Sequence, residues 1–404
     1  MCGSSSSADP GSRPEGASGL PVGGSPSGPV RETLYTKPFL LASAANALFY
    51  ANINAFNLLP LYIERLGGRE GEIGTIMAMY QVAAIGCQVG VGPLIDRFGR
   101  RPFLILSAGL ISLVSLAFMG TTRLGWHFYG LRFLQGAAVA GFNTSNLTLL
   151  ADLAPPGRRA EAVGIFGVSG LVMIALSPAG GEIVLRHFGF PVFFGVTLGL
   201  ALATLGVCLA GEVPREGVRE AAQRLGASFW RKFSPVFVPA FQFGLANGVV
   251  FVFLPPFAFT VGLPRVGPFY LVYSVAAVAV RFFGGRLADR LERRQIILPS
   301  LVGLAAGVLA LGLLQSTWLL ILVGIANGTA HGFLYPAVSA MAFDLAPAAA
   351  RGKALALFTS AILAGGIVGA VGFGWLAEVV GYRPAFFCVG LALGLGAAIF
   401  WRKR

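Results

Sequence analysis

Charged residues are scarce in this sequence: they make up 12% of the 404 residues, while hydrophobic residues make up 55%. Soluble domains carry about 25% charged residues, so this chain could not cover a water-exposed surface. It has no Gly-Lys-Ser/Thr nucleotide loop, which argues against direct use of ATP. Its three histidines and four cysteines lack metal-ligand spacing. We therefore expect a protein that is not an enzyme and that needs no cofactor and no metal.

Long apolar runs replace the missing charge, and each is close to the roughly 20 residues that cross a bilayer. Residues 1–36 precede them as a Ser-, Gly- and Pro-rich segment, which predicts a disordered cytoplasmic tail. The pattern predicts an all-α integral membrane protein with twelve transmembrane helices. The expected spans are 38–62, 72–95, 102–121, 126–151, 161–185, 190–211, 235–262, 267–288, 296–314, 317–343, 354–380 and 384–401.

The net charge of +13 has a topological explanation. With twelve spans, 22 of the 30 Lys and Arg residues fall on the side of the termini, six on the other side, and Arg132 and Arg281 within spans. Lys and Arg stay on the cytoplasmic side during insertion, so we expect both termini in the cytoplasm. This explains the charge without a nucleic-acid partner. We expect a monomer surrounded by lipid, in the cell (inner) membrane.

The sequence contains two copies of one pattern. Gly92–Arg101 after the second span matches Gly285–Arg294 after the eighth, and Asp152-Leu-Ala-Pro matches Asp344-Leu-Ala-Pro at the ends of the fourth and tenth. An even number of spans per repeat gives two halves of the same orientation. We predict two pseudo-symmetric six-helix bundles at 37–211 and 234–404, joined by a cytoplasmic linker at 212–233.

The repeated loop resembles the signature of the major facilitator superfamily, in the residues Gly92, Leu94, Asp96, Arg97, Gly99, Arg100 and Arg101. The second copy departs from it by having Glu292 where the family favours Gly. The resemblance implies two bundles that rock about a central cavity, with these loops as a gate on the cytoplasmic face. The Arg residues can pair with Asp152, Glu161 or Asp344; alternatively they are only positive-inside anchors. The predicted gating latch is Asp96, Arg97, Arg100, Arg101, Asp152, Asp289, Arg290, Arg293 and Asp344.

Polar stripes follow three of the spans that line the cavity in that family, the first, fourth and tenth. Amides and charges facing lipid are costly, so these faces should point to protein or water; helix–helix hydrogen bonding without a ligand is the alternative. On the seventh span, Gln242 and Asn247 do not share a face. The predicted substrate or proton path is Arg132, Gln135, Asn143, Asn54, Asn57, Asn327, His331 and Tyr335.

Two residues of this path are singled out. Arg132 precedes Gln135-Gly136, as an Arg often does in the family's fourth helix, where it is tied to proton coupling or anion binding; a snorkelling or structurally paired Arg is the alternative. His331 is the central residue whose ordinary pKa lies near neutrality, although a hydrogen-bonded core histidine has the same sequence signal.

Small residues mark the fifth and eleventh spans. The fifth resembles the glycine- and proline-rich helix of the family's drug and metabolite antiporters, with Ser177 in place of the usual Gly. We expect inter-bundle packing at Gly170, Pro178, Gly181, Gly365 and Gly369.

The sequence thus predicts a secondary active transporter that moves a small solute by alternating access, with protons as the coupling ion. Our preferred hypothesis is proton-coupled export of an amphipathic or hydrophobic compound. The alternatives are an uptake symporter or facilitator for a sugar-like or anionic metabolite, and a non-transporting membrane sensor or scaffold of the same fold.

Overall fold

All regular elements in the described part of the chain are helices. The computed structural model describes residues 34–155, 158–211, 227–263, 265–284, 291–347 and 350–402. Helices suit this composition because a bilayer cannot satisfy exposed backbone amides. The elements are α1 (Lys37–Ala55), η1 (Phe56–Leu58), α2 (Leu59–Arg65), α3 (Glu70–Phe98), α4 (Arg100–Met119), α5 (Trp126–Leu153), α6 (Arg159–Ala210), α7 (Ala227–Thr260), α8 (Gly267–Phe283), α10 (Arg293–Leu311), α11 (Thr317–Asp344), α12 (Arg351–Val380) and α13 (Tyr382–Arg402).

These helices agree with the twelve predicted spans. The segments α1, η1 and α2 together form the first span, and α6 contains the fifth and sixth because its backbone turns at Gly189, where φ is 76°. Eight stretches of the described residues are long and apolar enough to cross a membrane, and α8 is a shorter apolar helix. One boundary differs from the expectation: α7 already begins at Ala227, within the predicted linker.

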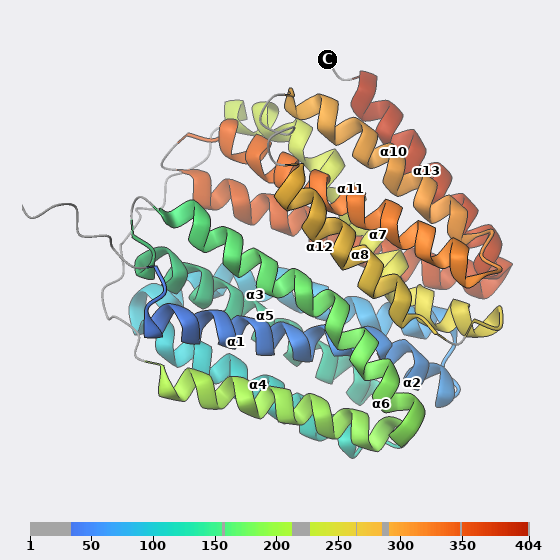
Figure 1. The fold of residues 1–404 in the computed structure, drawn as a ribbon, viewed down its shortest axis with the longest axis horizontal. Coiled ribbons are helices and arrows are strands. Elements are labelled where there is room, and N and C mark those ends of the chain that lie inside the picture. The colour runs from blue at the N-terminus through green and yellow to red at the C-terminus, as the bar shows by residue number, and fades with distance from the viewer. Residues whose placement is uncertain are drawn as a thin grey trace, which may run out of the picture. The chain divides into compact units, whose positions relative to one another are not determined.

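The sequence repeat is also a repeat of packing. In the first half, α1 packs on α6, α3 and α4 pack on α5, and α4 packs on α6. In the second half the equivalent contacts are α7 on α12, α8 and α10 on α11, and α10 on α13. The two halves meet where α3 lies against α12 and where α6 lies against α8 (Figure 1).

Single glycines turn the chain at several helix ends. Gly67 and Gly262 have φ of 86° and 75°, and each donates its N–H to a carbonyl oxygen of the preceding helix. Gly99, Gly189 and Gly381 form one-residue corners with φ of 84°, 76° and 84°. Side chains other than Gly are strained in this left-handed region. The corners therefore join consecutive helices with almost no connecting loop.

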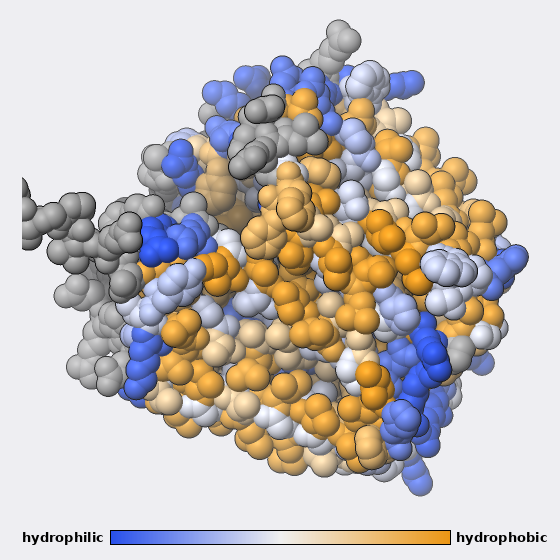
Figure 2. Space-filling model, in the orientation of Figure 1, coloured by the Kyte–Doolittle hydropathy of each residue, from blue (hydrophilic) through white to orange (hydrophobic). Residues whose placement is uncertain are grey.

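The helices present apolar side chains outward along their middle and basic side chains at their ends. Leu106, Phe283 and Val379 are among the exposed large apolar residues. Figure 2 shows an apolar band flanked on both sides by hydrophilic residues, the arrangement that a bilayer requires. We call the end that carries Arg100 and Arg293 the basic end, and the end that carries Arg69, Arg186 and Arg383 the opposite end.

Candidate functional site

A cavity of about 180 Å³ lies between the two halves. Its first-half wall comes from α1, η1, α3 and α5, and its second-half wall from α7 and α12. Three residues of the predicted path, Asn54, Asn57 and Arg132, belong to this wall. The lining residues are Ile53, Asn54, Asn57, Met77, Tyr80, Gln81, Arg132, Gly244, Asn247, Gly248, Phe251, Val252, Ile362, Leu363 and Gly366.

Arg132 is the buried cation of this wall, with 5% of its surface exposed. Its Nη1 donates to Gln135 Oε1, its Nη2 donates to the Met77 carbonyl oxygen at 3.4 Å, and its guanidinium lies 5.0 Å from the centre of the Tyr80 ring. Its Nε has no hydrogen-bond partner among the described residues. No carboxylate of the described part lies within ion-pair distance of it. The positive charge is therefore held by neutral groups alone, with one donor left over.

The polar stripe of α1 is tied to the other helices of its own half. Asn46 Nδ2 donates to Ser169 Oγ on α6 at 2.9 Å, and the Tyr50 hydroxyl donates to Asn143 Oδ1 on α5 at 3.0 Å. Asn54 Nδ2 donates to the Tyr50 carbonyl oxygen at 2.8 Å and also reaches the cavity. Asn143 thus positions α1 against α5, and Asn54 has both a structural bond and a place in the wall.

His331 lies in an aromatic cluster of the second half. Its Nδ1 is hydrogen-bonded to the Tyr273 hydroxyl, and its ring is 4.7 Å from that of Phe243. Tyr335 adds a ring at 6.1 Å from His331, and the Arg281 guanidinium lies 5.8 Å from the Tyr335 ring. His331 and Tyr335 are neighbours, as their spacing on α11 predicts, but neither is part of the cavity wall described above.

Asn327, the third residue of that stripe, faces away from the cavity. A β-carbon placed on Gly307 of α10 would lie 2.6 Å from Asn327 Oδ1, so the amide is pressed against α10 within the second half. It is not part of the cavity wall, and its role in the path stays a prediction. An i, i+4, i+8 row is wide enough to span two packing surfaces, because each step of four residues rotates the side chain by about 40°.

The cavity also contains residues that were not predicted. Tyr80 and Gln81 come from α3, and Asn247 and Phe251 come from α7. The family resemblance directs attention to four spans that do not include α3. Tyr80-Gln81 at the middle of an otherwise apolar span was the available signal, since a mid-membrane amide is costly without a partner or a cavity. The observation that Gln242 and Asn247 do not share a face is confirmed, because Gln242 contacts Gly396 of α13.

The predicted latch residues form matching pairs, but each pair lies within one half. Arg100 pairs with Asp152, and Arg293 Nε lies 3.4 Å from Asp344 Oδ2. The following arginines repeat this symmetry at the ends of α6 and α13: Arg101 donates to the Leu209 carbonyl oxygen at 3.0 Å. Its counterpart Arg294 donates to the carbonyl oxygens of Phe400 and Trp401, at 2.6 and 3.1 Å.

The rest of the latch is described only in part. Arg97 lies over the ring of Phe98 at 5.2 Å. Glu161 accepts two hydrogen bonds from Arg158, at 2.8 and 2.7 Å, and these bonds hold the pKa of the Glu161 carboxyl below its ordinary value. The Asp96 side chain, Asp289 and Arg290 lie outside the described residues. The gating role of these residues stays a prediction.

Four glycines predicted to pack between the halves face their own half instead. A β-carbon on Gly365 would lie 2.0 Å from an α7 carbonyl oxygen, and one on Gly369 2.4 Å from another. Gly170 faces α1, while Gly181 faces η1 and a phenylalanine of α6 itself. The prediction is wrong for these four positions. Both sides of α12 and α6 are packed, so glycine content alone does not tell which side meets the other half.

Other small residues make the contact between the halves. A β-carbon on Gly74 of α3 would lie 2.2 Å from the Ala370 carbonyl oxygen of α12, and one on Gly374 would lie 2.5 Å from the Glu70 carbonyl oxygen. Pro178 is buried in α6, and its neighbour Ala179 touches the start of α8. The backbones of the two halves therefore touch directly along α3 and α12.

Comparison with known proteins agrees with this architecture. The model of the Major Facilitator Superfamily matches residues 39–280 and 266–404. The chain is 22% identical over 373 residues to the Staphylopine export protein of Staphylococcus aureus, covering 88% of this chain and 93% of that protein. It is 26% identical over 375 residues to the Multidrug resistance protein MdtG of Salmonella paratyphi A, covering 85% and 88%. A crystal structure of the nucleoside transporter NupG has the same fold, with a TM-score of 0.77, 12% identity, and coverage of 90% and 99%.

Proposed function

Because this chain belongs to the Major Facilitator Superfamily and is a transmembrane transporter, we propose that its solute is an amphipathic organic anion and that it is exported. The transport cycle in this proposal is alternating access, in which the central cavity opens to one side of the membrane and then to the other. Protons supply the driving force, and the basic end faces the cytoplasm of a cell whose inner membrane holds the protein.

The buried charge of Arg132 carries the proposal of an anion. A cation removed from water raises the free energy of the folded protein unless an opposite charge compensates it. The described neighbours of Arg132 are neutral, and its Nε is free to donate. An arginine fork matches the geometry of a carboxylate or phosphate. A bound anion would therefore complete an arrangement that the protein leaves incomplete.

A second, partly buried cation supports the same solute class. Arg281 of α8 points toward α6, since a β-carbon on Gly167 would lie 3.5 Å from Arg281 Nη1, and its Nε has no partner in the described part. The apolar side chains of Ile53, Phe251 and Ile362 line the cavity between its amides. A solute with an anionic group and an apolar body fits such a wall.

The direction and the coupling ion rest on different support. Two relatives are named for export and for multidrug resistance, which favours export. Among the predicted path residues, His331 is the one with an ordinary pKa near neutrality. It is therefore the residue that we assign to proton coupling. The excess of Lys and Arg at the basic end supports a cytoplasmic location for that end.

Transport by purified protein in liposomes tests the solute class. Liposomes would be loaded with aryl carboxylates, with their neutral methyl esters, and with amines of the same size. We expect counterflow of the carboxylates only, and faster efflux when the receiving side is acidic. Equal counterflow of esters and acids would refute the anion. Accumulation of the solute in the same direction as the imposed proton flow would favour the uptake alternative.

A further inference from the structure

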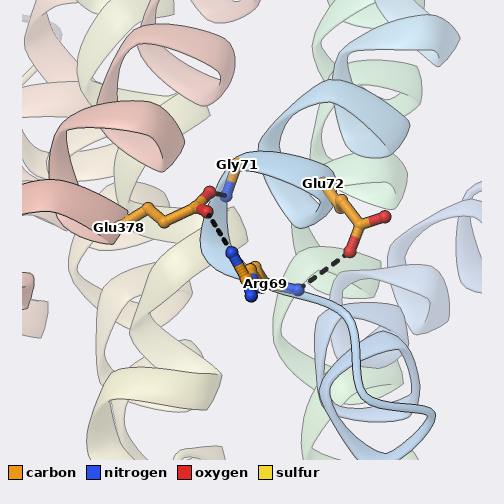
Figure 3. Close-up of polar contacts among 4 residues, drawn as sticks. All are labelled: Arg69, Gly71, Glu72 and Glu378. Atoms are coloured by element: carbon orange, nitrogen blue, oxygen red, sulfur yellow. Dashed lines mark hydrogen bonds and ion pairs between the residues drawn. The ribbon is translucent and has the colours of Figure 1, made fainter.

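At the opposite end, each half holds the first turn of a helix from the other half with a carboxylate. On one side of the interface, Glu378 of α12 reaches the start of α3 (Figure 3). Its Oε2 accepts the Gly71 N–H at 3.3 Å, and its Oε1 lies 3.4 Å from Arg69 Nη1. Glu72 meanwhile accepts the Arg69 N–H at 3.1 Å, which fixes the turn that presents Gly71. The first helical turn carries unpaired N–H groups and a partial positive charge, so a carboxylate is favoured there.

The other side of the interface repeats this contact with the halves exchanged. Glu182 of α6 accepts the N–H of Gly267, the first residue of α8, and its Oε1 lies 3.1 Å from Arg186 Nε. The Glu182 side chain is 9% exposed, against 23% for Glu378. We call the two contacts the α12–α3 clasp and the α6–α8 clasp. In both, an arginine assists a carboxylate that binds the helix start across the boundary.

Each clasp depends on a glycine at the helix start. A β-carbon on Gly71 would lie 2.6 Å from Glu378 Oε2, and one on Gly267 would lie 2.9 Å from Glu182 Oε2. Any other residue would push the carboxylate away from the N–H that it binds. Glycine is unfavourable in a helix, so its presence in both first turns is accounted for by the approach of the carboxylate.

The equivalent residues of the two clasps have the same separation in the sequence, and this separation differs from that of the two corner glycines. The same 196 residues separate Gly71 from Gly267 and Glu182 from Glu378. Relative to the corner glycines at 189 and 381, however, the two glutamates stand about one helical turn apart. The helix pairs α12–α3 and α6–α8 are therefore equivalent in the repeat. However, an alignment of the two halves on Gly189 and Gly381 would not place Glu182 opposite Glu378.

The clasps contrast with the ion pairs of the basic end. Those pairs, Arg100 with Asp152 and Arg293 with Asp344, join helices of the same half. Among the described residues, the ion pair that crosses between the halves is the one from Arg69 to Glu378, and it lies at the opposite end. The polar bonds that join the two halves within the described part of the chain thus lie at the opposite end.

We propose that the α12–α3 and α6–α8 clasps together form the gate that closes the opposite end of this transporter. Both bonds must break before the halves can part there, and water then solvates the freed carboxylates and helix starts. This assignment rests on the alternating access of the proposed function, but it does not depend on the identity of the solute.

Distances between spin labels in the full-length protein in lipid test the gate. One label pair replaces Trp126 and Trp318, which start α5 and α11 at the opposite end and are 84% and 76% exposed. A second pair replaces Phe98 and Leu291 at the basic end. The four native cysteines are replaced beforehand. The test variants are E182Q with E378Q, which keep the shape of the side chains and remove their charge.

We expect the double variant to raise the population with a long Trp126–Trp318 distance by about tenfold or more, the effect of losing one hydrogen bond to a charged group, and to shorten the Phe98–Leu291 distance. Gly372→Ala is the matched control on α12, because its β-carbon meets no atom within 4 Å. Gly71→Ala and Gly267→Ala test the same bonds with both carboxylates intact, and each should shift the distances in the same direction. Unchanged distances in the folded Glu and Gly variants would overturn the gate. A shift in these distances in a protein that transports none of the aryl carboxylates would support the gate and count against the proposed solute.

Discussion

Replacing Arg132 by Met distinguishes a binding role from a packing role, because the two roles predict different signs for stability. In the described part, Arg132 has only the neutral partners Gln135, the Met77 carbonyl and the Tyr80 ring. A buried cation without a counter-ion raises the free energy of the folded state, and apolar replacement of such charges is often neutral or stabilising. We therefore expect the unfolding midpoint of the solute-free protein to stay unchanged or to rise.

The affinity for the solute, in contrast to the stability of the solute-free protein, should fall in Arg132→Met. A hydrogen bond to a charged group contributes about 1.5–3 kcal/mol, so its loss should raise the dissociation constant by about 10- to 150-fold. At a solute concentration of about 100 times the wild-type Kd, binding stabilises the folded protein by about 2.7 kcal/mol. A roughly 30-fold weaker affinity would reduce that stabilisation to about 0.9 kcal/mol.

Thermal unfolding in detergent, with and without the transported anion, measures both quantities. Arg132→Lys is the control, since it keeps the charge and loses the planar fork; its solute-induced shift should fall between those of wild type and Arg132→Met. The reasoning is refuted if Arg132→Met keeps the full solute-induced shift. It is equally refuted if the variant unfolds at a much lower temperature without solute, because Arg132 would then be a packing residue.

Three further variants test the surrounding structure. Gly244→Ala should cost about 1–3 kcal/mol by overpacking, because its β-carbon would lie 1.8 Å from the Ile362 carbonyl oxygen; thermal unfolding should show no such loss for Gly372→Ala. Asn52→Leu removes two buried hydrogen bonds and should cost about 1–3 kcal/mol, with solute selectivity in counterflow unaltered. His331→Gln should abolish transport driven by a proton gradient while counterflow at equal pH persists; retained proton coupling would assign His331 to its bond with Tyr273 alone.

The fold could be predicted almost completely from the sequence, because lipid imposes a length and a polarity on every span. The twelve crossings and the two halves follow from apolar runs and from the repeated Gly92 and Gly285 motifs. Asp152 was among the predicted partners of the loop arginines for the same reason, since Arg100 and Asp152 lie at the same ends of neighbouring spans. Such features depend on position along the membrane normal, which a sequence encodes directly.

The sequence could predict a site residue only where the question was whether its side chain faces lipid or the protein interior. Arg132 reached the cavity as expected, because a mid-membrane charge must avoid lipid. Gly365 packs on α7 and Asn327 packs on α10, because α12 and α11 each meet several helices and the sequence does not say which neighbour a given residue meets. Gln81 was missed because it meets Gly366 of α12 beside the cavity, a contact between segments far apart in the chain.

The one-residue corners at Gly189 and Gly381 have a mechanical consequence for the two clasps. Glu182 and Glu378 stand within two turns of these corners, on arms that continue at once into the next span. Because no loop separates the two helices at each corner, a helix that tilts to release its carboxylate must move the helix that follows it in the chain. The two helices joined at each corner then move as one rigid unit. A sub-ångström change where the carboxylate meets the glycine is therefore converted into a larger displacement at the basic end of those helices.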